Sequence, residues 1–584
     1  MQHPYDLVIR GGRLFDGTGD PARAADVAVK DGLVAAVGDI AGAGTEEIDA
    51  CGMIVTPGFV DIHTHYDGQA TWDGRMQPSS WHGVTTVVMG NCGVGFAPCR
   101  KEDRGRLIAL MEGVEDIPHP VLAEGLPWNW ESYPDYLDAL SARAFDIDIA
   151  GQLPHAALRV FVMGERGANR EPASEADIAA MAAIAKGAVE AGAFGFTTSR
   201  TLNHRTSDGA PTPTLTAGED ELTGIALGLA AAGKGVLQVV SDFADPKAEF
   251  AMLRRIVERS GRPLSFTLAQ SSIDPQGYKG LLAALEDAVA AGLPMKAQVA
   301  ARAVGVLLGL ELTVNPFTHH PLYREIAALP LAERVARLSE ADFRARLIAE
   351  PPEGGTRGPP GAWARMHLMG AEPDYEPAAD STVAALAMAR GVSPEAVALD
   401  HMLTGGGRGM LYHPFLNYAK GSLEPARAML VHADTVPGLS DGGAHIGMIC
   451  DGSFPTSMIT HWTRDRTRGP KIALETVVRM QTRDTARAVG LDDRGLIAPG
   501  WRADLNVIDY EGLTLHAPSV AHDLPAGGRR LVQRASGYVA TIVAGVVTYR
   551  DGEATGPLPG RLLRGAKAPS EQPSSASRAS SQCS

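Results

Sequence analysis

The stretch Pro57–Asp67, PGFVDIHTHYD, closes a β-rich apolar run and carries two histidines, His63 and His65, one residue apart. Alternate side chains of a strand share a face, so these two imidazoles can converge on one cation. The preceding residues predict a strand over Met53–Ile62, which places the pair at the carboxyl end, where α/β barrels keep their chemistry. Taken alone, the pair is equally typical of two hydrogen-bonded core histidines.

Short apolar runs recur along the chain after this first strand and indicate an α/β fold. The further predicted strands are Val84–Gly90, Ile147–Pro154, Gly192–Ser199, Gly235–Phe243, Pro263–Gln270, Met295–Ala300 and Val436–Asp441. Most are separated by helical stretches; the clearest begins after Ser174, has Asp177 as a capping partner, and ends at Gly192. Eight strand–helix repeats predict a (β/α)8 TIM-like barrel.

Both ends of the chain contain short β-rich runs with tight turns, which predict one composite β-sandwich because isolated hairpins are marginal in water. The strand–helix alternation is interrupted between the seventh and eighth predicted strands. This interval is expected to be either a lid over the site or a surface insertion with no role at the site. The predicted division is 1–56 and 495–563 for the β-sandwich, 57–300 and 396–494 for the barrel, 301–395 for the insertion and 564–584 for a disordered tail.

Bulk composition limits the classes of function. The chain has 584 residues, 45% of them hydrophobic and 21% charged, with a net charge of −15. These values are those of an ordinary globular protein and argue against a nucleic-acid or anionic-membrane partner. Five scattered cysteines imply no disulfide framework, and no apolar run is long enough to span a membrane. We therefore expect a cytoplasmic protein with a small-molecule substrate; the oligomeric state stays open, with a homo-oligomer among the outcomes.

Two further residues fall where they could join the histidine pair. Cys92, in GVTTVVMGNCGVG, follows the second strand, and Asp441, in VPGLSDGGAH, ends the eighth. A thiolate is a good zinc ligand, and a carboxylate can ligate a metal and accept a proton from water. The alternatives are a small buried cysteine and an Asp-Gly turn.

Together these segments resemble the amidohydrolase superfamily, and within it the N-acyl-D-amino-acid deacylases, or D-aminoacylases. The motifs are PGFVDIHTHYD, GVTTVVMGNCGVG, SDGGAH and RGLIAPGWRADL, with GNCGV distinctive of the D-aminoacylase branch. The resemblance implies that His63, His65, Cys92 and Asp441 surround a zinc site. It also implies that Asp441 is the general acid/base.

The chain departs from this family at strands five and six. D-aminoacylases supply a metal-binding histidine from each, whereas here the strands read GVLQVVSDF and PLSFTLAQSS. One zinc ion held by His63, His65, Asp441 and Cys92 is therefore expected. The alternative is a substitute ligand such as Asp242 or His155, since Gln and Thr are poor zinc ligands.

The leading hypothesis is metal-dependent hydrolysis of the C–N amide bond of an N-acyl (D-)amino acid. The alternatives are a cyclic-amide hydrolase of the hydantoinase or dihydroorotase kind, and a metal-free scaffold. The candidate substrate-binding residues are His155, Arg200, His204 and His445.

Overall fold

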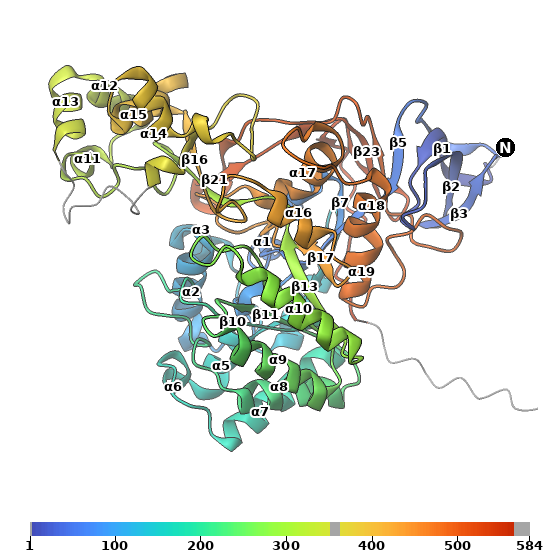
Figure 1. Ribbon diagram of the computed structural model, residues 1–584. Helices are drawn as coiled ribbons and strands as arrows, with labels where there is room; N and C mark the ends of the chain where they lie inside the picture. The colour runs from blue at the N-terminus through green and yellow to red at the C-terminus, as the bar shows by residue number, and fades with distance from the viewer. Residues whose placement is uncertain (1–2, 351–361, 566–584) are drawn as a thin grey trace, which may run out of the picture.

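The computed structural model describes residues 3–350 and 362–565, and it joins the two β-rich segments in one nine-stranded sheet (Figure 1). The strand order is β25-β24-β23-β18-β5-β1-β2-β3, with β4 pairing β1. The strands are β1 Tyr5–Leu14, β2 Arg23–Lys30, β3 Leu33–Gly38, β4 Gly44–Asp49, β5 Ile54–Pro57, β18 Leu505–Ile508, β23 Tyr538–Val543, β24 Val546–Arg550 and β25 Glu553–Ala554. Because β5 pairs β18, the prediction that the two segments share one β structure is confirmed.

The chain between these segments forms two parallel sheets, β6-β7-β8 and β17-β13-β12-β11-β10-β9. Their strands are β6 Phe59–Asp61, β7 Val84–Met89, β8 Asp148–Gly151, β9 Leu153–Pro154, β10 Gly195–Arg200, β11 Val236–Ser241, β12 Leu264–Leu268, β13 Met295–Ala300 and β17 Thr435–Gly438. The sheets meet at two places. Thr64 forms a parallel bridge with Gly442, and the amide of Phe194 donates to the Gly151 carbonyl at 2.8 Å.

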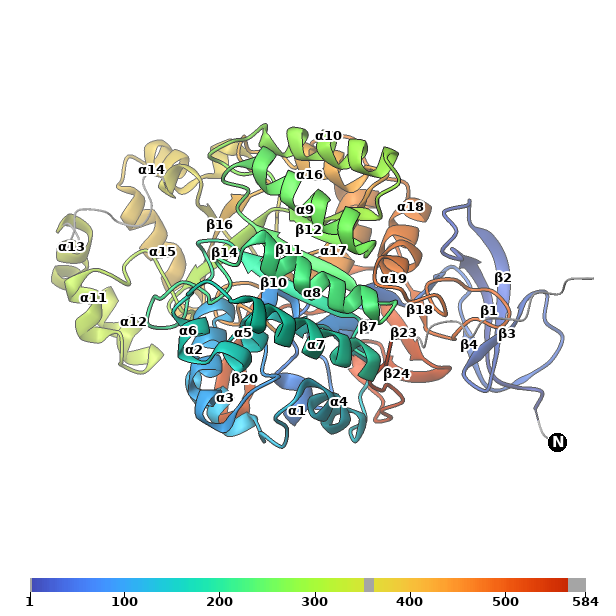
Figure 2. The ribbon, with the colours of Figure 1, turned by 90° about the horizontal axis from the view of Figure 1, so that it is seen from below.

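Helices alternate with these strands and pack in sequence order outside them (Figure 2). They are α1 Gln69–Trp72, α2 Arg104–Glu115, α3 His119–Gly125, α4 Tyr133–Ser141, α5 His155–Met163, α6 Glu165–Ala168, α7 Glu175–Ala191, α8 Glu219–Ala231, α9 Pro246–Ser260, α10 Gly277–Ala290, α16 Glu424–Leu430, α17 Phe454–Thr460, α18 Leu474–Arg479 and α19 Thr485–Ala488. The helix predicted after Ser174 is α7. Its capping box with Asp177 is formed, and Gly192 is its C-cap, as expected.

The predicted strand Met53–Ile62 is two strands, and this corrects the expectation. β5 belongs to the nine-stranded sheet and β6 to the parallel sheet, with the break at Gly58. The Gly58 amide donates to the Asp504 carbonyl at 2.8 Å, while that of Phe59 donates to Gly83 at 3.0 Å. A Cβ at position 58 would collide with the Thr85 side chain, so only glycine fits this crossing.

The expected insertion has its own small core and projects from the side opposite β1–β3 (Figure 1). A three-stranded sheet of order β14-β16-β15 anchors it. Its elements are β14 Val304–Gly309, α11 Pro321–Ile326, α12 Leu331–Ser339, α13 Ala341–Ala349, β15 His367–Leu368, α14 Val383–Arg390, α15 Pro394–Gly407 and β16 Met410–Leu416.

Four further strands form two hairpin-like pairs, β19 Thr514–Leu515 with β22 Ala535–Ser536 and β20 Ser519–Leu524 with β21 Gly528–Val532. Residues 351–361 of the insertion and 566–584 of the predicted tail lie outside the described residues. Within the described ranges, no helix combines the length and apolar character needed to cross a membrane.

Candidate metal centre

His63 and His65 leave the end of β6 and meet Cys92 in a fully buried cluster. Each residue offers a ligand atom, and these atoms all lie within 4.8 Å of one another. His63 Nε2 is 3.3 Å from Cys92 Sγ, and the two imidazole centroids are 5.7 Å apart. Two imidazoles and a thiol at this spacing are a donor set suited to zinc.

Cys92 sits in a short 3-10 turn, Asn91–Gly93, just after β7, with a φ of +54°. A non-glycine residue in the left-handed region is strained, and such strain clusters at functional sites. Burial raises the pKa of the Cys92 thiol well above its ordinary value, and Glu115 adds to that effect. Without a nearby cation the sulfur is therefore a neutral thiol, whereas a bound metal would deprotonate it.

The orientation of His63 is fixed by a residue that the sequence patterns did not single out. Gln298 Oε1, on β13, accepts a hydrogen bond from His63 Nδ1 at 2.8 Å. Gln298 in turn donates to Ser265 Oγ on β12 at 3.0 Å. Because Nδ1 carries the proton in this arrangement, Nε2 keeps its lone pair for a metal.

Asp441 lies three residues beyond β17, with a φ of +49°, and reaches both histidines. Its Oδ1 is 3.3 Å from His63 Nε2 and 3.6 Å from His65 Nε2. Burial alone would raise the pKa of Asp441, but the adjacent imidazoles of His65 and His63 hold it well below its usual range. The carboxylate is therefore ionised at neutral pH.

Glu115, the last residue of α2, is a member of the site that sequence reasoning missed. It is 1% exposed, and its Oε1 is 3.2 Å from His65 Nδ1. Its Oε2 is 3.5 Å from His445 Nε2, and its carbonyl accepts the His445 amide. Burial, with the charges of Asp441 and Asp67, raises the pKa of Glu115 well above its ordinary value. A carboxyl group behind a ligating histidine commonly orients that ring.

The four candidate substrate-binding residues have different surroundings. His445 lies beside the cluster, 4.0 Å from Asp441 Oδ2. His204 is half-buried, and its Nδ1 is 2.8 Å from Ser199 Oγ. His155 is fully buried and bonded to Thr198 Oγ1 and Glu221, while Arg200 pairs with Glu249. The structure therefore brings His445 to the cluster and gives His155 and Arg200 other partners.

Strands five and six, β11 and β12, bring no histidine to the cluster. Gln238 on β11 is buried, and neither end of its amide has a hydrogen-bond partner. The proposed substitute Asp242 instead accepts hydrogen bonds from Thr201 Oγ1 at 2.5 Å and the Leu202 amide at 2.8 Å. Neither Asp242 nor His155 belongs to the ligand group that the described residues form.

The donor set fits a bound cation. Both ring nitrogens of His65, Asp441 Oδ1 and both Glu115 oxygens are buried, and none has a partner with hydrogen-bond geometry. Buried polar atoms without partners cost free energy, so a group of them around a thiol and two imidazoles fits a bound cation. The side chains that could hold a zinc ion here are His63, His65, Cys92 and Asp441.

Comparisons with known proteins identify the class of this chain. A family model described as the amidohydrolase family matches residues 46–549. The chain belongs to the amidohydrolase family.

Individual relatives narrow the likeness to deacylases. D-aminoacylase from Alcaligenes xylosoxydans xylosoxydans is 37% identical over 196 residues, 33% of this chain and 38% of that protein. The N-acyl-D-aspartate deacylase of the same organism is 38% identical over 196 residues, 33% of this chain and 36% of that protein. An uncharacterized Mycobacterium tuberculosis protein is 28% identical and covers 94% of this chain and 92% of its own length.

A solved D-aminoacylase with a binuclear metal centre superposes with a TM-score of 0.63 at 25% identity, covering 96% of this chain and all of that chain. The fold is also that of the N-acyl-D-glutamate deacylase of Bordetella bronchiseptica, solved with zinc and a phosphonate inhibitor, at 24% identity and a TM-score of 0.63. That match covers 96% of this chain and 99% of the deacylase. The predicted D-aminoacylase resemblance is confirmed.

Proposed function

We propose that this amidohydrolase cleaves the amide bond of N-acyl-D-amino acids, with one zinc ion held by His63, His65, Cys92 and Asp441. The observation that carries the proposal is the buried cluster whose nitrogen and sulfur atoms lie within 4.8 Å of one another. The D-aminoacylase and N-acyl-D-aspartate deacylase relatives support the choice of substrate class.

A bound zinc ion supplies Lewis acidity, which polarises a carbonyl oxygen and acidifies water. Asp441 accepts the proton of the attacking water and delivers it to the departing amine, a role suited to its ionised carboxylate. Gln298 orients the His63 ring through its hydrogen bond, and the Glu115 carboxyl group faces the His65 ring at 3.2 Å. His445, beside Asp441 at the edge of the cluster, contacts the substrate.

A single metal position is favoured over two. The second position would need donors from β11 and β12, where the buried polar side chains are Gln238 and Ser265. An amide and a hydroxyl are weak zinc ligands beside imidazole. Ser265 is also engaged by Gln298.

The finer architecture belongs to the same proposal. The bridge between Thr64 and Gly442 and the bond from Phe194 to Gly151 support closure of the parallel sheets into a (β/α)8 barrel. The nine-stranded sheet supports a β-sandwich domain made of segments 1–56 and 495–563. Residues 301–395, extended by the rest of α15 and by β16 to Leu416, then form an insertion beside the barrel mouth.

The test combines metal analysis with turnover. The purified protein is expected to hold about one equivalent of zinc and to hydrolyse N-acyl-D-amino acids in preference to their L-isomers and to hydantoins. Asp441→Asn, assayed with saturating zinc, should lose about 100-fold or more in kcat, because removal of a general base has this effect.

Three outcomes would contradict the proposal. Less than about a tenth of an equivalent of metal, with no rescue by added zinc, removes the metal centre. If the protein hydrolyses hydantoins faster than every N-acyl amino acid, cyclic amides replace N-acyl amino acids as the substrate class. Full activity in Asp441→Asn removes the assigned base and leaves the metal site standing.

A further inference from the structure

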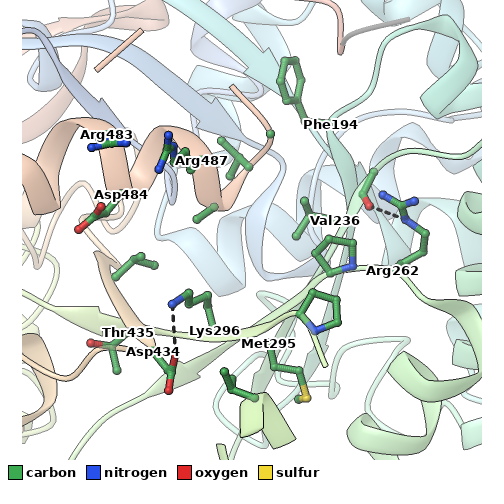
Figure 3. A pocket seen from close by; sticks show the side chains of 18 of the residues that line it. Phe194, Val236, Arg262, Met295, Lys296, Asp434, Thr435, Arg483, Asp484 and Arg487 are labelled. Atoms are coloured by element: carbon green, nitrogen blue, oxygen red, sulfur yellow. Dashed lines mark hydrogen bonds and ion pairs between the residues drawn. The ribbon is translucent and has the colours of Figure 1, made fainter. Parts of the chain in front are cut away.

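A cavity lies at the opposite edge of the parallel strands from the metal cluster. It has a volume of about 850 Å³ and is lined by Phe194, Val236, Pro263, Met295 and Thr435 among others. These residues precede or begin β10, β11, β12, β13 and β17, whereas the metal-site residues follow strand ends. We call it the basal pocket (Figure 3). Enzymes of this architecture keep their chemistry at the other edge, so the basal pocket is no part of the metal site.

The basal pocket is strongly basic in a chain whose net charge is −15. Its lining includes two acidic side chains, Asp434 and Asp484. Its cationic side chains are Lys234, Arg262, Lys296, Arg479, Arg483 and Arg487. Positive charge concentrated in a concavity of an acidic protein creates a local field that attracts anions.

The two acids are already neutralised by two of the cations. Lys296 Nζ is 3.4 Å from Asp434, and Arg479 Nε is 3.1 Å from Asp484. Among the described residues, the side chains of Lys234, Arg483 and Arg487 lie within ion-pair distance of no carboxylate. The Nε of Arg483 is buried and has no hydrogen-bond partner, a costly arrangement for a charged group.

The unpaired arginines face the pocket from two sides. Arg483 and Arg487 lie on the helical segment that follows α18, and Arg262 lies across the cavity just before β12 (Figure 3). Arg262 uses its Nε to bind the Gly235 carbonyl at 3.1 Å, and burial lowers its pKa. The rest of its guanidinium fork remains for a ligand. A guanidinium fork matches carboxylate and phosphate oxygens.

Apolar side chains complete the wall between these cations. Phe194, Val236 and Met295 line the cavity together with Val289 and Leu293. We propose that the basal pocket binds a small organic dianion, with carboxylate or phosphate groups at the arginines and an apolar body against this wall. The site is separate from the metal centre and does not depend on the proposed hydrolase activity.

The test is isothermal titration of the full-length, metal-loaded protein at low ionic strength. The probes are isophthalate, a rigid dicarboxylate, and phenyl phosphate, with benzoate as a monoanion of similar shape. We expect one dianion to bind at one site, more tightly than benzoate. The double variant Arg483→Ala/Arg487→Ala should weaken its Kd about tenfold or more, since it removes charge-assisted hydrogen bonds from two guanidinium groups.

Arg390→Ala is the matched control, because Arg390 is an exposed arginine on α14 outside the pocket. It should bind the dianion as the wild type does. If the double variant does not fold, the exposed Arg487→Ala alone should weaken binding and keep the native thermal transition. Tighter binding of phenyl phosphate indicates that the ligand is a phosphate ester. Tighter binding of isophthalate indicates that it is a dicarboxylate. Failure of both dianions to bind, or an unchanged Kd in the arginine variants, overturns the proposal.

Discussion

Removing the charge of Glu376 should destabilise the protein by about 3 kcal/mol at neutral pH. Glu376 follows β15, is 3% exposed, and accepts a bidentate ion pair from Arg466 at 3.0 and 3.1 Å. The Leu423 amide donates to the same carboxylate at 2.9 Å, and His461 Nε2 lies 3.2 Å away. This contact fastens the insertion to the segment that follows α17.

The magnitude follows from the pKa of the carboxyl group. Burial would raise the pKa of Glu376, but His461 and Arg466 together lower it from 4.5 to about 2. A tenfold change in proton affinity corresponds to about 1.4 kcal/mol, so the ionised form is stabilised by about 3 kcal/mol on folding. An independent comparison gives a similar loss in the free energy of unfolding. Removing one partner of a buried ion pair costs about 3–5 kcal/mol, because the other charge stays buried.

The assay is urea unfolding of Glu376→Gln, followed by tryptophan fluorescence, since Trp462 lies 4.8 Å beneath the Arg466 guanidinium. Glu424→Gln is the matched control. Glu424 contacts the same arginine at 3.2 Å but is 44% exposed, so its loss should cost less than about 1 kcal/mol.

The direction of the pKa shift determines how the stability contribution of Glu376 changes with pH. A depressed pKa contributes stability above the unfolded value of 4.5, and that stability is lost as the pH falls toward about 2. The difference between wild type and Glu376→Gln should therefore be constant from pH 7 to about 5.5 and shrink below pH 4.5. Equal destabilisation by Glu376→Gln and Glu424→Gln, or a difference that grows on acidification, would refute the reasoning.

Three further predictions concern single side chains. Cys92→Ala should remove most of the bound zinc, whereas Cys99→Ala, at a buried cysteine outside the cluster, should leave metal content unchanged; equal loss in both would contradict the assignment. Glu115→Gln should weaken zinc binding about 10–100-fold in a chelator competition, because its carboxyl group lies 3.2 Å from His65 Nδ1, behind the ligating ring. An affinity equal to wild type would remove Glu115 from the site. Ser174→Ala should lower the free energy of unfolding by about 1 kcal/mol through loss of the α7 cap, and Ser207→Ala, in an exposed loop, should not.

Much of the scaffold could be predicted because strand periodicity and turn chemistry are local. The α7 cap and the strand before Cys92 lie where the sequence indicates. The break at Gly58 was missed because two sheets share one apolar run, and only the position of Thr85 from a neighbouring strand shows why glycine stands there.

The cluster was predicted in part for the same reason. His63 and His65 are adjacent on one strand, so their convergence follows from strand geometry alone. Glu115 was missed because it reaches His65 from the end of a helix about 50 residues away, and its local sequence is that of an ordinary helix terminus. Gln298 reads as one polar residue in a buried strand, and its role depends on a contact with His63 from across the sheet.

The pairing of β5 with β18 has a consequence for synthesis of the chain. Val55 on β5 pairs with Val507 on β18. The pairing of β5 therefore cannot be completed until a segment about 450 residues downstream has been synthesised. At about 5–20 residues per second, a ribosome needs roughly 20–90 s to make that segment. During this time the N-terminal strands present an unpaired edge, which makes them a site for chaperone binding or for aggregation. β5, which directly precedes the metal-bearing strand β6, is among the first strands to be made, yet its pairing with β18 is among the last to form.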